Sequence, residues 1–297
     1  ASKGHTLTIR KFARDPWTII DFINNETITA KLAALLWLAI QYEMTVLVSG
    51  GTASGKTSLL NVMMPFIPPN QRVVTIEQTR ELQLPSFLQW NPLITRLPNP
   101  EGKGEITMLD LLVNSLRMRP DRIVLGEIRR KEEAEVLFEA IHTGHSVYST
   151  VHADSLSETI TRLVNPPISI SENLLASVNL CVVMFRDRRK GIRRVYQVGE
   201  FVAGEEAGGI KISSNILFRY KTESDKIVPH AKSLVFFDNI SRLTGMSTQE
   251  INKDLSEKEK ILDILAKRGI RSTEEVGKIM YEYYLNKEGV LRRLKAK

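Results

Sequence analysis

Eight consecutive residues restrict the fold of this chain more than any other feature. They run from Gly50 to Thr57 and read Gly-Gly-Thr-Ala-Ser-Gly-Lys-Thr, which is a glycine, four residues and then Gly-Lys-Thr. An apolar strand pattern, Val46 to Val48, precedes the motif, and a helical pattern follows it. Glycines allow backbone amides to close around a phosphate chain, and the amino end of the next helix adds positive potential. We therefore expect a strand, a phosphate-binding loop and a helix rather than a chance glycine-rich turn.

Short apolar strands alternate with helical patterns around this motif, which is typical of βαβ units in a parallel sheet. The predicted strands cover residues 45–48, 72–76, 122–125, 146–151 and 181–185. The predicted helices cover residues 31–42, 57–64, 108–118, 131–142 and 157–163. Near-continuous apolar strands suit a sheet that helices cover on both faces. We predict an α/β fold with a parallel-rich sheet flanked by helices.

The pattern changes after residue 194. Two strand patterns, residues 195–202 and 210–220, predict a β-hairpin, and helical patterns fill the remainder. We therefore predict three parts: a leading segment over residues 1–30, a nucleotide-binding core over residues 31–194, and a hairpin with a small helical subdomain over residues 195–297. Residues 84–104 contain four prolines and show no period, so we interpret them as a surface loop.

Composition narrows the class of protein. The chain has 297 residues, of which 42% are hydrophobic and 25% charged, as in ordinary globular proteins. The apolar run between Lys31 and Glu43 is much shorter than the roughly 20 residues of a membrane-spanning helix. Cys181 is the one cysteine, so no internal disulfide is possible and a reducing cytosol is favoured. The net charge of +7 permits nucleic acid, acidic lipid or a nucleotide as partner.

Two glutamates follow predicted strands downstream of the phosphate loop. Glu77 ends the strand pattern 73–76, and Glu127 follows the pattern 123–126. The carboxyl ends of parallel strands meet at one edge of the sheet, where a phosphate loop needs carboxylates for metal and water. We therefore interpret both as site residues rather than as solvated charges, with Lys56 on the β and γ phosphates and the Thr57 hydroxyl on Mg²⁺.

Three histidines, His142, His145 and His152, lie close together in the sequence. A zinc site is one interpretation, but strand alternation separates these side chains and the lone cysteine adds no ligand. We favour His145 and His152 as sensors of the γ-phosphate, with structural histidines as the alternative.

Four segments together resemble a known family. They are Gly-Gly-Thr-Ala-Ser-Gly-Lys-Thr-Ser (50–58), Thr-Ile-Glu-Gln-Thr-Arg-Glu-Leu (75–82), Arg-Pro-Asp-Arg-Ile-Val-Leu-Gly-Glu-Ile-Arg (119–129) and Thr-Gly-His-Ser-Val-Tyr-Ser-Thr-Val-His-Ala (143–153). In this order they look like the Walker A, Asp box, Walker B and His box of the type II/type IV secretion ATPase superfamily. The loop and the tail look most like its archaeal branch, which contains secretion, pilus and archaellum motors of the GspE and FlaI kind.

The resemblance implies a RecA-like core in a homo-hexameric ring that hydrolyses ATP between subunits. Glu77 would polarise the attacking water, and Glu127 would hold hydrated Mg²⁺ together with Thr57. The nucleotide would be bound by Gly51, Thr52, Ala53, Ser54, Gly55, Lys56, Thr57 and Ser58. His145 and His152 would be the His-box residues. Arg80, Arg96 and Arg129 are candidates for neutralising γ-phosphate charge, with ordinary surface arginines as the alternative.

The sequence departs from the family pattern at two positions. Gln78 stands where the family usually has aspartate, and Arg130 where it usually has glycine. Because Glu77 and Glu127 are both present, we still expect activity. The family's amino-terminal domain is not seen before the motor segment, so we expect a motor domain without it, monomeric by itself.

We expect a cytoplasmic ATPase, peripheral to the membrane, that acts on an inner-membrane platform protein to power secretion or filament assembly. The basic residues of 186–194 and the carboxyl end, with Arg292, Arg293, Lys295 and Lys297, would face acidic lipid or an acidic partner loop, or are simply solvated. No nucleic-acid partner is expected, because no basic stretch interleaves with aromatics. A nucleic-acid translocase, a non-hydrolysing nucleotide-gated scaffold and a P-loop kinase remain alternatives.

Overall fold

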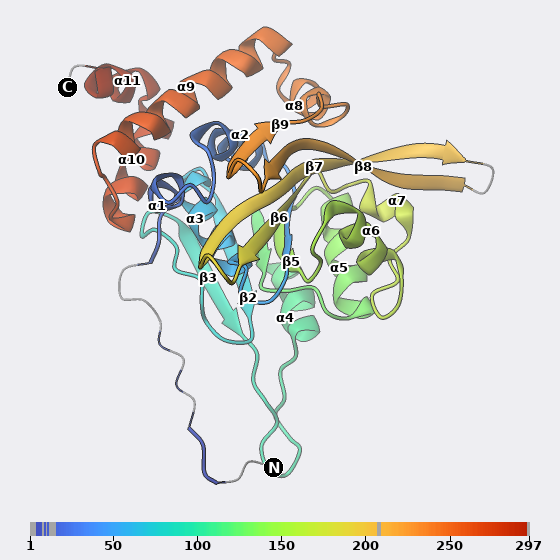
Figure 1. Cartoon of the computed structure of the whole chain (residues 1–297). Helices are drawn as coiled ribbons and strands as arrows, with labels where there is room; N and C mark the ends of the chain where they lie inside the picture. The colour runs from blue at the N-terminus through green and yellow to red at the C-terminus, as the bar shows by residue number, and fades with distance from the viewer. Residues whose placement is uncertain (1–3, 8, 10, 12–15, 207–208, 296–297) are drawn as a thin grey trace.

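A nine-stranded sheet runs through the described part of the chain in the computed structural model, which describes residues 4–7, 9, 11, 16–206 and 209–295 (Figure 1). Its strands are β1 Val46–Gly50, β2 Arg72–Glu77, β3 Gln89–Ile94, β4 Arg122–Leu125, β5 Ser146–Val151, β6 Leu180–Asp187, β7 Ile192–Glu206, β8 Gly209–Lys221 and β9 Lys226–Pro229. Their order across the sheet is β3-β2-β4-β5-β1-β6-β7-β8-β9. Pairing is parallel from β3 to β6 and antiparallel from β6 to β9. The predicted α/β class with a mostly parallel sheet is confirmed.

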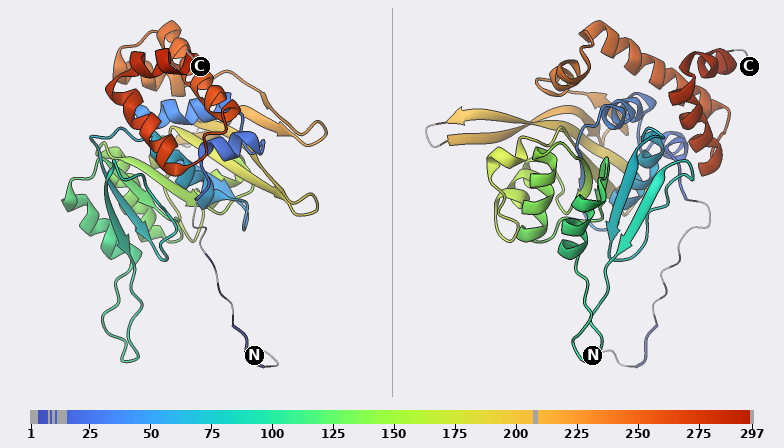
Figure 2. Two further views of the ribbon diagram at one scale, coloured as in Figure 1. Left: turned by 90° about the vertical axis from the view of Figure 1, so that its left-hand side faces the viewer. Right: turned by 180° about the vertical axis from the view of Figure 1, so that it is seen from behind.

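Helices cover both faces of this sheet (Figure 2). The α-helices are α1 Ile19–Asn24, α2 Ala30–Gln41, α3 Lys56–Met63, α4 Met108–Ser115, α5 Lys131–His142, α6 Leu156–Val164, α7 Glu172–Leu175, α8 Phe236–Thr244, α9 Thr248–Lys267, α10 Thr273–Leu285 and α11 Lys287–Lys295, with 3-10 turns η1 Met64–Phe66 and η2 Leu116–Met118. One core cluster joins the sheet to α1–α3 and α8–α11, and the other joins it to α4–α7.

Alternate residues of the central strand face these two cores. Val46 and Val48 belong to the cluster beneath α2, whereas Leu47 belongs to the cluster beneath α5. All three are fully buried. Side chains of successive strand residues point to opposite faces, so a strand covered on both faces is apolar throughout. The phosphate loop therefore begins directly at the end of a fully buried strand, β1.

The carboxyl-terminal helices pack on α2 (Figure 1). Trp37 of α2 is fully buried, stacks on Phe66 at 5.2 Å and meets the Tyr283 ring edge-on at 4.7 Å. Its indole Nε1 donates to the hydroxyl of Tyr284 at 3.0 Å. The core therefore continues from the sheet through α2 into α9 and α10.

The structure adds elements that the sequence patterns did not indicate. β3 lies within residues 84–104, which we interpreted as a loop. It is the edge strand and holds Pro92, which an edge strand tolerates because the missing amide can face outward. α1, α7 and β9 are also additional. β7 begins at Ile192, so the predicted boundary at residue 195 falls inside a strand.

Among the described residues, no helix combines the length and the apolar character that a membrane span requires.

Candidate nucleotide-binding site

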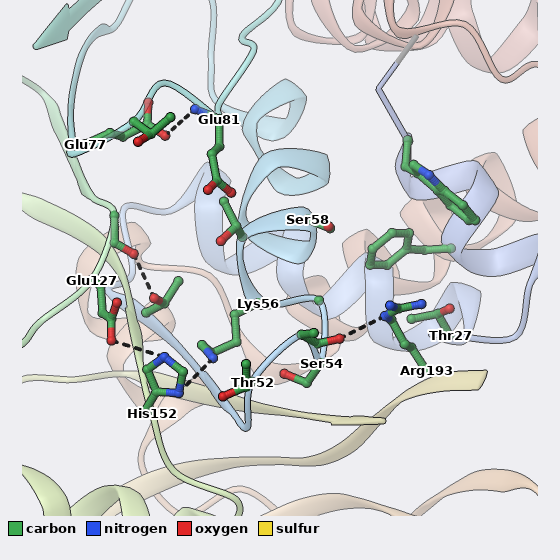
Figure 3. A pocket seen from close by; sticks show the side chains of 18 of the residues that line it. Thr27, Thr52, Ser54, Lys56, Ser58, Glu77, Glu81, Glu127, His152 and Arg193 are labelled. Carbon is green, nitrogen blue, oxygen red and sulfur yellow. Dashed lines mark hydrogen bonds and ion pairs between the residues drawn. The ribbon is translucent and has the colours of Figure 1, made fainter. Parts of the chain in front are cut away.

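A cavity of about 1080 Å³ lies at the carboxyl ends of β1, β2, β4 and β5 (Figure 3). Parallel strands place their carboxyl ends at the same edge of a sheet, so residues far apart in sequence meet there. The phosphate loop forms one wall of the cavity, and Glu77, Glu127 and His152 lie together on one side of it. The sequence therefore located the edge at which the site lies.

The predicted phosphate-loop residues form one wall. Thr52, Ala53, Ser54, Gly55, Lys56, Thr57 and Ser58 all line the cavity. Gly55 has a φ of 100°, which glycine adopts without strain, and α3 begins at the next residue. Gly51 turns the backbone closely past Asp154, since a Cβ at Gly51 would lie 2.8 Å from a carboxylate oxygen of Asp154. Gly55 needs glycine for its backbone conformation, whereas at position 51 the neighbouring Asp154 carboxylate is the end of a flexible side chain that could move aside.

Lys56 is held inside the loop. Its Nζ donates to the carbonyl oxygens of Gly50 and Gly51 at 2.8 and 3.0 Å and lies 3.4 Å from Nδ1 of His152. Burial lowers the pKa of Lys56, while Glu127 and Asp154 oppose that shift. The ammonium therefore has two backbone carbonyls and the His152 ring as partners, which a bound phosphate group can replace.

Glu77 ends β2 with a buried carboxylate. Its Oε1 accepts from the backbone amides of Glu81 and Leu82 at 2.9 and 3.1 Å, whereas its Oε2 is buried without a hydrogen-bond partner. Burial raises the pKa of Glu77 above that of an ordinary glutamate. The Glu77 side chain lines the cavity, and its second carboxylate oxygen is a buried acceptor without a partner.

Glu127, Arg129 and His152 form one connected group. Arg129 Nε and Nη2 lie 2.8 and 2.7 Å from Oε2 of Glu127, and His152 Nε2 lies 3.3 Å from Oε1. Arg129 also donates to Oε1 of Gln78 at 2.7 Å. Burial and the neighbouring Lys56 lower the pKa of His152, and Glu127 opposes the shift. The structure therefore brings four residues of the Asp, Walker B and His boxes into contact.

Four predicted site residues do not line the cavity, namely Gly51, Arg80, Arg96 and His145. His145 precedes β5 at the opposite end of the strand from His152, and its Nδ1 lies near Thr143 and the Ala140 carbonyl. A six-residue strand spans about 20 Å, so the two histidines cannot act on one phosphate within this chain. Arg96 donates to the carbonyl of Gly104, and Arg80 lies over the Trp90 ring at 4.6 Å.

The wall opposite Lys56 was not indicated by any motif. Trp17, Phe22, Asn25 and Thr27 line it, and the rings of Trp17 and Phe22 meet edge-on at 6.2 Å. Arg193 enters from β7, and its Nε donates to the Ala53 carbonyl at 3.1 Å (Figure 3). Side chains of successive strand residues point to opposite faces, and this alternation is the signal in the sequence that could have distinguished Arg193, which points into the cavity, from its basic neighbours.

The basic segment 186–194 is divided by the fold. Arg188, Arg189 and Lys190 are exposed in the β6–β7 turn, but Arg194 is buried and pairs with Asp225. At the carboxyl end Arg292 and Arg293 pair with Glu288 and Glu282. Residue 297 and the side chain of residue 295 lie outside the described part of the chain. Of the basic segment, the exposed charges therefore lie at the end of β6, in the turn and at Arg193, whereas Arg194 is withdrawn from the surface.

The zinc interpretation receives no support within the described residues, where no group of three or more His, Cys, Asp or Glu side chains is placed to hold a metal ion. His142 is exposed at the end of α5, away from His152.

A family model described as type II/IV secretion system protein matches residues 1–190, which is more than half of the chain. The chain belongs to this family. The resemblance that the four boxes carry is thereby confirmed.

Two family relatives are uncharacterised proteins of Methanocaldococcus jannaschii. One is 34% identical over 288 residues, 95% of this chain and 51% of the relative. The other is 37% identical over 264 residues, 87% of this chain and 95% of the relative. The chain thus spans about half the length of the first relative. Among solved structures, the VirB11 ATPase of the Brucella suis type IV secretion system in complex with sulphate is 31% identical, with 56% of this chain and 50% of that chain covered and a TM-score of 0.47.

Proposed function

We propose that this chain binds and hydrolyses Mg-ATP. The observation that carries the proposal is the cavity that Lys56, Glu77 and Glu127 share. An ammonium for the phosphates, a buried carboxylate with a free oxygen and a second carboxylate beside it are the parts that phosphoryl transfer to water requires. Catalysis would consist of positioning and electrostatic stabilisation, with Glu77 polarising the water.

The residues present suit a magnesium ion. Thr57 offers a hydroxyl and Glu127 a carboxylate at the same cavity. Mg²⁺ keeps several waters and is held by one or two protein oxygens together with substrate phosphates, so no cage of protein ligands is needed. Thr57 would bind it directly and Glu127 through water. The ion would supply charge neutralisation on the phosphate oxygens.

The rest of a nucleotide has room along the opposite wall. Trp17 and Phe22 offer apolar ring surface, Asn25 and Thr27 offer polar groups, and Arg193 adds a guanidinium between this wall and the loop. Apolar rings and neutral polar groups suit a base and a ribose, whereas a polyphosphate alone would make no use of them. The proposed ligand is therefore a nucleoside triphosphate.

Phosphate release from ATP by the purified chain tests this function. We expect Lys56→Ala to lose ATP affinity at least tenfold, because it removes the buried ammonium. Glu77→Gln should keep ATP affinity and lose turnover by about 100-fold or more. Glu105→Gln, on the exposed loop, is the control. Equal turnover in Glu77→Gln and the unchanged chain would remove Glu77 from its role.

We further infer that hydrolysis is coupled to secretion or to assembly of pilus-like or archaellum filaments. This inference rests on membership of the secretion-system family. The working form would be a homo-hexamer at the cytoplasmic face of the membrane, acting on an inner-membrane platform protein. Tight ATP binding without turnover, also in the presence of that platform, would favour a nucleotide-gated scaffold instead. Stimulation of turnover by single-stranded DNA would favour a nucleic-acid translocase.

A further inference from the structure

The carboxylate proposed for magnesium is already neutralised in this structure. Both oxygens of Glu127 face a side-chain nitrogen: Oε2 faces two nitrogens of Arg129 at 2.7 and 2.8 Å, and Oε1 faces His152 at 3.3 Å. The carboxylate is mostly covered, whereas about half of the Arg129 side chain is exposed. Arg129 is thus the partner that is free to move into solvent.

A hydrated magnesium ion and Arg129 need the same atoms. The waters of Mg²⁺ donate hydrogen bonds to carboxylate oxygens, and Arg129 occupies Oε2 of Glu127 with two donors. Two cationic groups on one carboxylate also repel each other. Binding of the ion at Glu127 therefore requires that Arg129 leave or rotate.

Gln78 holds Arg129 in this position. Its Oε1 accepts from Nη1 of Arg129 at 2.7 Å, on the side of the guanidinium away from Glu127. Parallel pairing of β2 with β4 brings both residues to the same edge of the sheet, where Gln78 directly follows β2 and Arg129 lies four residues beyond the end of β4. The amide is neutral, so it orients the guanidinium without competing with Glu127 for the positive charge.

We propose that Arg129, positioned by Gln78, is a built-in counter-ion that occupies Glu127 until magnesium and nucleotide arrive. The inference rests on the proposed function and deepens it, because it names how the metal site is regulated. Its consequence is a raised magnesium requirement for nucleotide binding. The nucleotide itself still binds without metal through Lys56.

The magnesium dependence of binding of a fluorescent ADP analogue tests the proposal. ADP lacks the γ-phosphate, so any contact of Arg129 with that group does not affect the result. We expect Arg129→Met to lower the half-saturating magnesium concentration about fivefold, the upper range for a partly exposed ion pair. Gln78→Met, which keeps the side-chain length and removes the acceptor, should lower it less. Affinity measured in EDTA should not rise in either variant, because removing the guanidinium or its anchor adds no positive charge to the cavity.

Lys131→Met is the matched control, because its ion pair with Glu135 is exposed and lies outside the cavity. An unchanged or raised magnesium requirement in Arg129→Met, with unchanged melting temperature, would overturn the counter-ion proposal. In that case the proposed function would still stand. Absence of ADP binding by the unchanged chain at every magnesium concentration would overturn both.

Discussion

Glu77 carries a cost in stability that its proposed role explains. A buried carboxylate with one oxygen lacking a hydrogen-bond partner is unfavourable in the folded state, and burial raises its pKa from the ordinary 4.5. Because its folded-state pKa lies above the unfolded value, the contribution of Glu77 to the free energy of unfolding is greatest below pH 4.5 and is lost as pH rises through the folded pKa. At neutral pH the ionised side chain therefore destabilises the fold.

Glu77→Gln should consequently stabilise the protein while abolishing turnover. The amide oxygen still accepts from the amides of Glu81 and Leu82, and the buried charge disappears. We expect the melting temperature at pH 7.5 to rise by roughly 2 °C, and the difference to vanish below about pH 4.5. Thermal unfolding of both proteins at several pH values measures this, with Glu105→Gln as control. A lower melting temperature of Glu77→Gln at pH 7.5 would show that the ionised Glu77 carboxylate does not destabilise the fold.

At the scale of residues, the sequence indicated those residues of the candidate site that belong to short motifs. Lys56, Glu77 and Glu127 all lie at the carboxyl ends of parallel strands, where chain direction alone places them together. His145 and His152 lie at opposite ends of β5, because only His152 follows the strand. Trp17 lies on a segment without periodicity, so only the folded structure shows that it lines the cavity.

Among the elements, β7 is the strand on which close packing is most demanding. Gly199 lies in β7 where the register shifts against β8. A Cβ there would lie 2.4 Å from the carbonyl oxygen of Asn215 and 2.5 Å from Cδ1 of Leu156. The first contact is with backbone, which cannot rotate away as a flexible side chain can.

Gly199→Ala should therefore lower the free energy of unfolding by about 1–3 kcal/mol, the usual cost of overpacking. Gly204→Ala on the same strand is the matched control, because its Cβ would meet nothing closer than 3.9 Å. Urea unfolding of the two variants compares them directly. Equal midpoints for both variants would show that β7 and β8 separate at this register shift.

The elements also show where sequence patterns lose information. Strands such as β1 and β5, in which every residue is buried, were predicted from their β-branched and apolar residues. β3 alternates between half-buried and exposed residues and contains Pro92, so its pattern resembles a loop. An edge strand gains its hydrogen bonds from one neighbour and needs less apolar surface. β3 therefore forms because it pairs with β2, and its own sequence pattern does not indicate a strand.

At the scale of the whole molecule, one core spans the predicted boundary at residue 195. Trp37 in the first part contacts Tyr283 and Tyr284 in the second, and Lys258 lies over its ring at 5.5 Å. β7 crosses the boundary within a strand. Elements that share a buried core and a sheet gain their stability together. We therefore expect residues 16–295 to unfold as one cooperative unit rather than as two domains.

Scanning calorimetry of the unchanged chain and of Trp37→Ala tests this expectation. The unchanged chain should give one transition whose calorimetric and van't Hoff enthalpies agree. Removal of the indole costs about 3–5 kcal/mol through lost burial and a cavity, and the whole transition should move to lower temperature. Trp17→Ala, which removes an indole that is 54% exposed, should barely move it. Two transitions, of which Trp37→Ala shifts only one, would instead establish residues 195–297 as an independent folding unit that merely rests on α2.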